Sequence, residues 1–329
     1  MSKSIGNVII PAKVMNQLGA DILRLWVSSV DYTADVRVSD SNFKQVSEVY
    51  RKIRNTLRFL HGNTSDFNPA TDAVAFENLR TVDKFVYVRL QDLIKEVREA
   101  YENYEFAGVY HAVNNFCTGE LSSFYLDIAK DVVYIEGADH PHRRAMQTVM
   151  YETLITLLKL LTPIVPHTTD EMWAFIEHKT EESIQLTDMP EAQDLGQEAQ
   201  ALRERFATLM LVRDDVLKAL EEARNSKIIG KSLEAKVTVA VPVPEKLADV
   251  FAADDIDFAQ FFIVSKFAEG DIANMPEGTL KLDAVSVLVE NADGEKCERC
   301  WTISETIGSD ETHPTLCTRC AEVVKVHYS

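Results

Sequence analysis

The stretch Cys297-Glu-Arg-Cys300, followed by Cys317-Thr-Arg-Cys320, places four thiols near the end of the chain in two Cys-x-x-Cys pairs. Each pair holds two sulfurs a tight turn apart, and two such pairs can close a tetrahedron around one Zn²⁺. Zinc suits four soft thiolates, and a closed four-ligand site leaves no open position for catalysis. The spacing therefore predicts a structural zinc ribbon with one Zn²⁺ bound by Cys297, Cys300, Cys317 and Cys320.

Two disulfides are the alternative use of these four cysteines. The sequence shows no secretory leader, so we expect a cytoplasmic protein, in which disulfides are rare. The fifth cysteine, Cys117, lies in an apolar helical pattern, which predicts a buried and unreactive thiol. The longest apolar run, residues 154–165, is interrupted by Lys159 and Pro163. It is too short to span a membrane, so no membrane partner is expected.

Charge is distributed unevenly along the chain. The 329 residues are long enough for two or three domains and carry a net charge of −18, which argues against non-specific nucleic-acid binding. Residues 1–62 nevertheless contain nine Lys or Arg and five Asp or Glu. A locally basic segment in an acidic chain favours binding of a polyanion at one defined place.

A basic stripe lies in the next predicted helix. Apolar side chains recur every three or four positions over residues 41–60, which predicts a helix. Arg51, Arg54 and Arg58 fall beside that apolar face. They can contact phosphates, or they can form a solvated face with their stems along the apolar surface. The residues alone leave both interpretations open.

Most of the remaining chain shows helical periodicity. Pro11 and Gly19 are placed to start and end a first helix, and Asp21 is placed to cap the next one. Long helices with short links indicate a helical bundle. We expect further helices over residues 76–104, from 106 past 116, around 121–128, over 143–161, from 166, and after the linker 191–201 to about 225.

A small mixed region follows the helices. Residues 237–241, 262–266 and 282–290 are typical of strands. The segment Gly230-Lys231-Ser232 looks like part of a phosphate-binding loop, but position 225 is Asn where that motif requires Gly, so no such loop is predicted.

Several stretches resemble one enzyme family. Met1-Ser2-Lys3-Ser4 resembles the second signature of class I aminoacyl-tRNA synthetases, Lys-Met-Ser-Lys-Ser, without its first Lys. Residues 19–32 resemble the isoleucine, valine and leucine subgroup, and residues 121–127 and 161–173 resemble its anticodon-binding bundle. The cysteine pairs with Trp301, together with residues 227–236, are similar to bacterial isoleucyl-tRNA synthetases.

This resemblance implies a reaction and a set of partners. The parent enzyme would use ATP, with Mg²⁺, to activate L-isoleucine as an aminoacyl-adenylate and transfer it to isoleucine tRNA. Lys3, with Met1, Ser2 and Ser4, would belong to the loop that stabilises the leaving pyrophosphate. Arg51, Arg54, Arg58 and Trp301 would contact the tRNA. The nucleotide-binding and editing domains have no counterpart here, so we expect a C-terminal fragment that is inactive alone and monomeric.

The expected fold is mainly α. An anticodon-binding helical bundle is followed by a small α/β junction domain and a C-terminal zinc ribbon. The predicted domains are residues 1–40, the end of the catalytic domain with the signature loop; 41–190, the bundle; 191–235, a long helix and linker; 236–292, the junction domain; and 293–329, the zinc finger.

The sequence also allows other functions for this chain. One is a stand-alone zinc-containing RNA-binding module, and another is a valyl or leucyl relative. A DNA-repair glycosylase carries a similar zinc finger, but its catalytic N-terminal residues and β-rich domain have no counterpart in this sequence.

Overall fold

A computed structural model describes residues 4, 8–241, 251 and 255–328. The chain divides into two compact units, each assembled from separate segments. The helical unit comprises Met1–Ala75, Val86–Leu126 and Gln147–Asp194, and the C-terminal unit comprises Phe76–Phe85, Asp127–Met146 and Leu195–Ser329.

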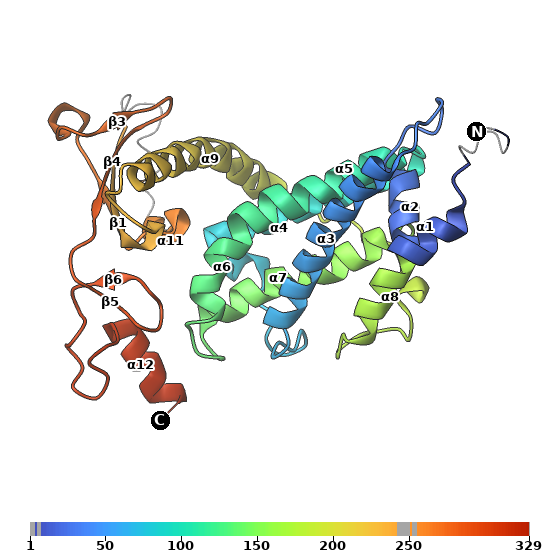
Figure 1. Cartoon of the computed structure of the whole chain (residues 1–329). Coiled ribbons are helices and arrows are strands. Elements are labelled where there is room, and N and C mark those ends of the chain that lie inside the picture. Colours follow the sequence, from blue (N-terminus) through green and yellow to red (C-terminus); the bar gives the residue numbers. More distant parts are fainter. Residues whose placement is uncertain (1–3, 5–7, 242–250, 252–254, 329) are drawn as a thin grey trace. The chain divides into compact units, whose positions relative to one another are not determined.

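Helices dominate the structure, as the sequence predicts, with a small sheet near the C-terminus (Figure 1). Buried leucine, valine and phenylalanine side chains along these helices supply the cores. The principal helices are α1 Pro11–Leu18, α2 Ala20–Ser28, α3 Asp40–Asn63, α4 Thr81–Glu102, α5 Phe106–Asn115, α6 Leu126–Val133, α7 Pro141–Leu161, α8 Pro166–Ala174, α9 Gly196–Asn225, α11 Phe258–Phe262 and α12 Thr318–His327.

Helix α3 confirms the prediction made for residues 41–60 and extends it at both ends. Ser39 caps its N-terminus, because its hydroxyl accepts the N–H of Asn42 and so satisfies one free amide of the first turn. Leu57 and Leu60 are fully buried on the apolar face. The same periodicity that predicts the helix therefore also selects its buried side.

The start of the chain corrects one prediction. Gly19 ends α1 with φ +93°, a backbone conformation that favours glycine. Asp21, however, does not cap its own helix. Its buried carboxylate accepts hydrogen bonds from the N–H and the hydroxyl of Thr168, at 2.7 and 2.6 Å, and so caps the first turn of α8. Sequence position indicates a cap, but tertiary packing decides which helix it serves.

A π-helical segment joins α5 and α6, where the sequence suggested two separate helices. It covers Phe116–Tyr125. The hydroxyl of Ser122 donates to the carbonyl of Cys117, five residues earlier, at 2.7 Å. Leu121, Phe124 and Tyr125 are fully buried. The helical rod therefore continues through this segment with a wider winding.

The C-terminal unit contains a four-stranded sheet in the order β2-β1-β4-β3. β1 pairs with β2 in parallel and with β4 antiparallel, while β3 and β4 form a hairpin closed by a bond from the Leu282 N–H to the Val285 carbonyl. Helix α9 packs on β1 and β4. The strands are β1 Ala235–Ala240, β2 Lys266–Glu269, β3 Leu280–Lys281 and β4 Ser286–Asn291.

Two of the three strand predictions need correction. The strand at residues 237–241 is confirmed as β1, but residues 282–285 form the hairpin turn, so β4 starts only at Ser286. Residues 262–266 are not a strand. Phe258–Phe262 forms helix α11, and Ile263 ends it with φ +59°. Strand β2 begins three residues later, at Lys266.

The first predicted long helix is also shorter than expected. Phe76–Asn78 forms a single 3-10 turn, and α4 begins only at Thr81. Among the described residues, no helix combines the length and the hydropathy that crossing a bilayer would need.

Candidate metal centre and nucleic-acid interface

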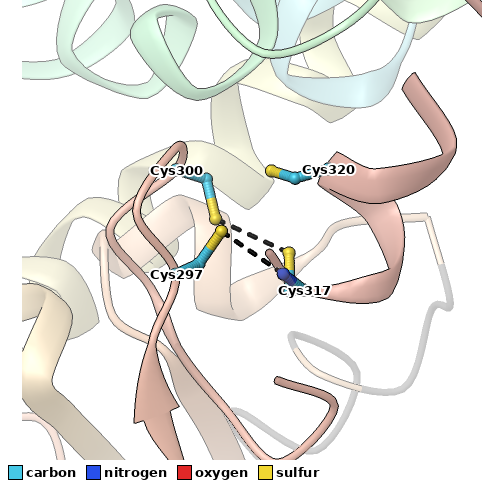
Figure 2. A group of neighbouring side chains, drawn as sticks. All are labelled: Cys297, Cys300, Cys317 and Cys320. Carbon is cyan, nitrogen blue, oxygen red and sulfur yellow. Dashed lines mark hydrogen bonds between the residues drawn. The ribbon is translucent and has the colours of Figure 1, made fainter. Parts of the chain in front are cut away.

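Two short loops bring the four predicted cysteines together (Figure 2). Their sulfur atoms all lie within 4.8 Å of one another. The first pair follows strand β5, Glu295–Lys296, and the second pair lies at the start of α12. The ligand set that the spacing predicts is therefore assembled by the fold.

The backbone of the first pair forms a tight knuckle. Trp301 adopts φ +67° and donates its N–H to the Cys297 carbonyl at 3.0 Å. Gly294 lies against the turn at the other strand of the hairpin, β6 Ile303–Ser304, where a Cβ would fall 2.4 Å from the Ser304 carbonyl carbon. Only glycine fits that position without displacing the hairpin.

Three of the four thiols, those of Cys300, Cys317 and Cys320, have pKa values shifted by their neighbours and by burial, in opposite directions. Hydrogen bonds from the Cys320 thiol and from Thr302 lower the pKa of Cys300 to about 4. Burial raises the pKa of Cys317 to about 11, and the hydrogen bond to Cys300 raises the pKa of Cys320. At neutral pH the cluster alone would hold thiolate beside thiol. A divalent metal ion stabilises all four as thiolates and releases their protons.

The geometry fits zinc. A Zn–S bond of about 2.3 Å in a regular tetrahedron requires a sulfur–sulfur distance of about 3.8 Å. The Sγ atoms of Cys300 and Cys317 are 3.8 Å apart. The backbone N–H of Cys317 donates to the sulfur of Cys297, a contact that offsets negative charge on a thiolate. The four cysteines therefore suit one structural Zn²⁺, and no position is left for substrate.

Each Cys-x-x-Cys pair has an arginine directly before its second cysteine, and the two arginines make different contacts. The guanidinium of Arg299 approaches the sulfur of Cys320 at 3.8 Å and the ring of Tyr328 at 5.9 Å. Arg319 instead donates to Asp131 at 2.9 Å and to Glu136 at 2.6 Å. Burial lowers the pKa of Arg319, but the two carboxylates outweigh burial and raise it overall.

Contacts beyond the ligands tie the ribbon to the end of α6 and to the residues that follow it. Ile135 packs against Cys297, Cys317 and Cys320 in one buried cluster. Together with the Arg319 ion pairs, this contact anchors the ribbon within its own unit. Sequence reasoning did not identify Ile135, Asp131 or Glu136. The only signal was the unexplained arginine in the second pair.

The predicted arginine stripe lies on one side of α3, but its members differ. Arg51 forms an ion pair with Glu48, and Arg54 lies 4.0 Å from Glu171. Arg58 is exposed and has no ion-pair partner in the part of the chain that the structure describes. The positive charge that the stripe offers to a ligand is therefore concentrated at Arg58.

Most of the predicted signature loop lies outside the described residues. Met1, Ser2 and Lys3 lie outside the described residues, and Ser4 is exposed.

The fourth predicted RNA contact, Trp301, is 58% exposed at the surface of the ribbon. Lys296 lies over its ring at 5.4 Å.

The segment Gly230-Lys231-Ser232 is closed by a carboxylate of the chain itself. Glu234 accepts the N–H groups of Gly230 and Lys231 at 2.7 and 3.2 Å. These two hydrogen bonds are the main reason why the pKa of Glu234 lies below its usual range. The backbone donors that a phosphate would need are therefore occupied.

Known protein families match three parts of the chain. Residues 83–239 match the anticodon-binding domain of tRNA ligases. Residues 294–323 match the zinc finger found in FPG and IleRS, and residues 1–39 match the class I tRNA synthetases for I, L, M and V. The three matched segments follow one another along the chain in the order class I synthetase, anticodon-binding domain and zinc finger.

Comparison with curated proteins gives a more specific similarity than the family matches do. The chain is 58% identical over all 329 residues to the isoleucine–tRNA ligases of Bacillus cytotoxicus and Bacillus cereus. It is therefore related over its whole length to bacterial isoleucine–tRNA ligases, as its sequence motifs predict, and it spans 35% of their length.

One solved structure shows a weaker likeness. It is the ternary complex of Agrobacterium radiobacter K84 LeuRS with tRNA, at 19% identity and a TM-score of 0.42, and it covers 77% of this chain and 27% of its own. A likeness at that level carries no argument for fold or function.

Proposed function

We propose that this chain is the tRNA-binding part of an isoleucine–tRNA ligase. One observation carries the proposal: an anticodon-binding domain is followed by a metal-held ribbon that exposes Trp301. Exposed aromatic side chains stack on unpaired bases, as in an anticodon loop. The 58% identity to isoleucine–tRNA ligases supports isoleucine tRNA as the partner.

The longer protein would join L-isoleucine to that tRNA with ATP, through an aminoacyl-adenylate. Lys3 would then act on the ATP phosphates, with Mg²⁺ sharing their charge. Isoleucine–tRNA ligases are the standard example of an enzyme whose binding pocket alone gives limited selectivity for isoleucine over valine. We expect the 329 residues alone to support no isoleucine-dependent exchange of pyrophosphate into ATP.

Arginines on α3 would position the RNA through its phosphates. Such contacts contribute affinity without reading sequence. Because Glu48 and Glu171 already offset two of the three charges, Arg58 should contribute most. Trp301 would contact a base instead, so the two regions should differ in their response to salt.

Binding of labelled tRNA across a salt series tests the proposal. Wild-type protein should bind isoleucine tRNA more tightly than a non-cognate tRNA. Arg58→Ala should weaken both about equally and lower the slope of log K against log salt by about one. Arg54→Ala should act in the same direction with a smaller effect. Lys52→Ala is the matched control, because Lys52 is an exposed cation of the same helix that lies about 120° around it from Arg58.

Two results would contradict the proposal. If wild-type protein bound cognate and non-cognate tRNA with equal affinity, the proposed specificity for isoleucine tRNA would be wrong. If it bound no tRNA even at low salt, the proposed tRNA-binding function would be wrong. An unchanged slope in Arg58→Ala would show instead that the stripe is a solvated helix face.

We further propose a cytoplasmic monomer. All five cysteines are free of disulfides, which fits a reducing compartment. Sedimentation of the purified chain measures the oligomeric state.

A further inference from the structure

A cavity in the helical unit lies between helix α2, the turn that joins α7 to α8, and residues 184–189. Helix α2 packs against α8 at this end of the unit (Figure 1). The cavity has a volume of about 440 Å³, which falls within the range of about 300–1,000 Å³ for small-molecule sites. All of its lining residues belong to the same compact unit.

Arg24 lines the cavity with a positive charge that is held in place. Its Nε and one of its terminal nitrogens donate to the carbonyls of Ile164 and Pro163, both at 2.8 Å. These carbonyls orient the guanidinium but carry no net charge that would neutralise it. Among the described residues, no carboxylate forms an ion pair with Arg24. A planar guanidinium fixed in this way suits a phosphate or a carboxylate.

Lys159 adds a second cation to the same cavity. It lies half-buried in the last turn of α7, where a positive charge stabilises the helix. Its charge reaches Glu152, two turns earlier: burial raises the pKa of Glu152, and Lys159 partly lowers it. Lys159 nevertheless forms no ion pair within the part of the chain that the structure describes. Its ammonium donors can therefore bind a ligand in the cavity.

One acidic side chain, Asp188, lines the cavity together with the two cations. It is exposed and forms no ion pair with a described residue. Two cations and one carboxylate leave an excess of one positive charge while His167, which also lines the cavity, is neutral. A simple anion would be attracted by Arg24 and Lys159 and repelled by Asp188. A ligand that carries both an anionic group and hydrogen-bond donors would satisfy all three side chains.

We propose that this cavity binds a ribonucleotide, with its phosphate on Arg24 and Lys159 and a ribose hydroxyl donating to Asp188. Carboxylates recognise ribose hydroxyls at other nucleotide sites, and arginine and lysine both bind phosphate. The apolar rings of Pro163 and Pro166 line the same cavity and can contact the base. The inference goes beyond the proposed function and does not depend on it, because a free nucleotide and a nucleotide of an RNA chain offer the same groups.

Calorimetric titration of the 329-residue chain with AMP at low salt tests the site. Wild-type protein should bind AMP, and it should bind adenosine, which lacks the phosphate, at least about ten-fold more weakly. Lys159→Met keeps an apolar stem without the charge and should weaken AMP about five- to ten-fold. Lys95→Met is the matched control, because Lys95 is an exposed lysine of the same unit outside the cavity, and it should leave the affinity unchanged.

The substitution Lys159→Arg separates a lost charge from a lost fold. It keeps the positive charge, so it should keep AMP affinity within about two-fold of the wild type. Thermal unfolding of each variant shows whether the helical unit is intact. Weakening in Lys159→Arg equal to that in Lys159→Met would show that the charge of Lys159 does not bind the phosphate.

Asp188→Ala tests the ribose contact separately. Wild-type protein should bind AMP about five-fold more tightly than 2′,3′-dideoxy-AMP, which lacks both ribose hydroxyls. The Asp188 variant should bind these two nucleotides equally, because it has lost the acceptor. It should bind inorganic phosphate more tightly than wild type does, because a like charge has been removed. A variant that keeps the preference for AMP would contradict the contact between Asp188 and ribose.

Isoleucine tRNA distinguishes the two sources of the nucleotide. If the nucleotide belongs to RNA, saturating tRNA should abolish AMP binding, and Lys159→Met should weaken tRNA and AMP by similar factors. If the nucleotide is free, AMP should bind equally well with tRNA present. Either result supports the site, because both require a ribonucleotide in the cavity.

Two results would overturn the site: no saturable AMP binding up to about 5 mM, a concentration that covers even weak sites, or equal affinities of Lys159→Met and Lys95→Met. In either case the proposed function still stands if wild-type protein binds isoleucine tRNA. Binding of AMP by a chain that binds no tRNA would support the cavity and contradict the proposed function.

Discussion

The cysteine in the helical unit and the four cysteines in the ribbon are protected by different means. Cys117 is fully buried in the π-helical segment, and burial raises its pKa to about 12. Cys297 is equally buried, but its neighbours are three other sulfurs and a few apolar side chains. Apolar packing protects the first thiol, whereas the ribbon relies on a metal ion.

The difference follows from the amount of core each region can build. Helices α3 and α7 present long apolar faces, and many of their side chains are fully buried. The ribbon contributes short strands, a single helix and the small cluster around Ile135. A segment of this size supplies too little apolar burial to fold without a metal or another cross-link.

Removal of zinc should give the largest effect. A structural zinc site contributes about 10–16 kcal/mol of apparent binding energy at neutral pH, so a strong chelator should unfold the ribbon. Thiol titration should then detect four reactive cysteines per chain, while Cys117 stays protected and the far-UV helical signal persists. Cys300→Ser should show the same pattern, with loss of zinc by metal analysis.

The same experiment tests whether the ribbon unfolds separately from the helices, because it contacts Ile135, Asp131 and Glu136. Because they contact the ribbon, unfolding of the ribbon should loosen the end of α6 and the residues that follow it. Simultaneous exposure of all five thiols would show that the ribbon and the helices unfold as one cooperative unit. The two regions would then not be stabilised independently.

Truncation in the core of the helical unit should rank second. Leu57→Ala removes a fully buried side chain of α3 and should cost about 2–5 kcal/mol in urea unfolding. Zinc content should stay at one per chain. The control Leu186→Ala alters an exposed side chain of the same unit and should change stability by less than about 0.5 kcal/mol. Loss of zinc from the Leu57 variant would contradict independent stabilisation.

The Arg319 anchor should give a smaller effect. Arg319→Ala leaves the carboxylates of Glu136 and Asp131 without their partner, which should cost about 1.5–3 kcal/mol, the range for hydrogen bonds to charged groups. Hydrogen exchange should rise first in α12 and after α6. Lys325→Ala is the control, because it removes an exposed lysine of the same helix that pairs with Asp310 in the loop before α12, and it should cost less than about 1 kcal/mol. Equal effects would show that the anchor is a surface pair.

The smallest effect should come from the strained knuckle. Trp301 has a left-handed backbone, φ +67°, which costs a non-glycine residue about 1–2 kcal/mol. Trp301→Gly should therefore strengthen zinc retention by about 1 kcal/mol in a chelator competition, whereas Trp301→Ala keeps the strain and should leave it unchanged. Weaker retention in the glycine variant would show that the indole, through Lys296, supports the knuckle.

The sequence predicted those features that depend on local spacing. The ligand set depends on two Cys-x-x-Cys pairs, and α3 depends on apolar residues at steps of three and four, so both could be predicted from the chain. Asp131 and Glu136 could not, because their partner Arg319 lies more than 180 residues away in the chain. Pairings of that separation depend on the folded topology.

The wrong strand prediction for residues 262–266 has a local cause. Aromatic and β-branched residues favoured a strand, but Asp257 accepts the N–H of Gln260 at 3.1 Å and caps a helix. Phe258, Phe261 and Phe262 then face the core together. The cap and the spacing of three and four were the signal that the propensity of single residues concealed.

The π-helical segment at Phe116–Tyr125 has a consequence for changes in chain length. Deleting one residue from a regular α-helix rotates everything after it by about 100°, so its buried face turns away from the core. A segment wound by wider i→i+5 turns contains more residues than an α-helix of the same length. We therefore expect deletion of the exposed Ser123 to draw on this surplus, by tightening the winding while the flanking faces keep their orientation. The π-helical segment can then accept a change in chain length during evolution, whereas the flanking α-helices cannot.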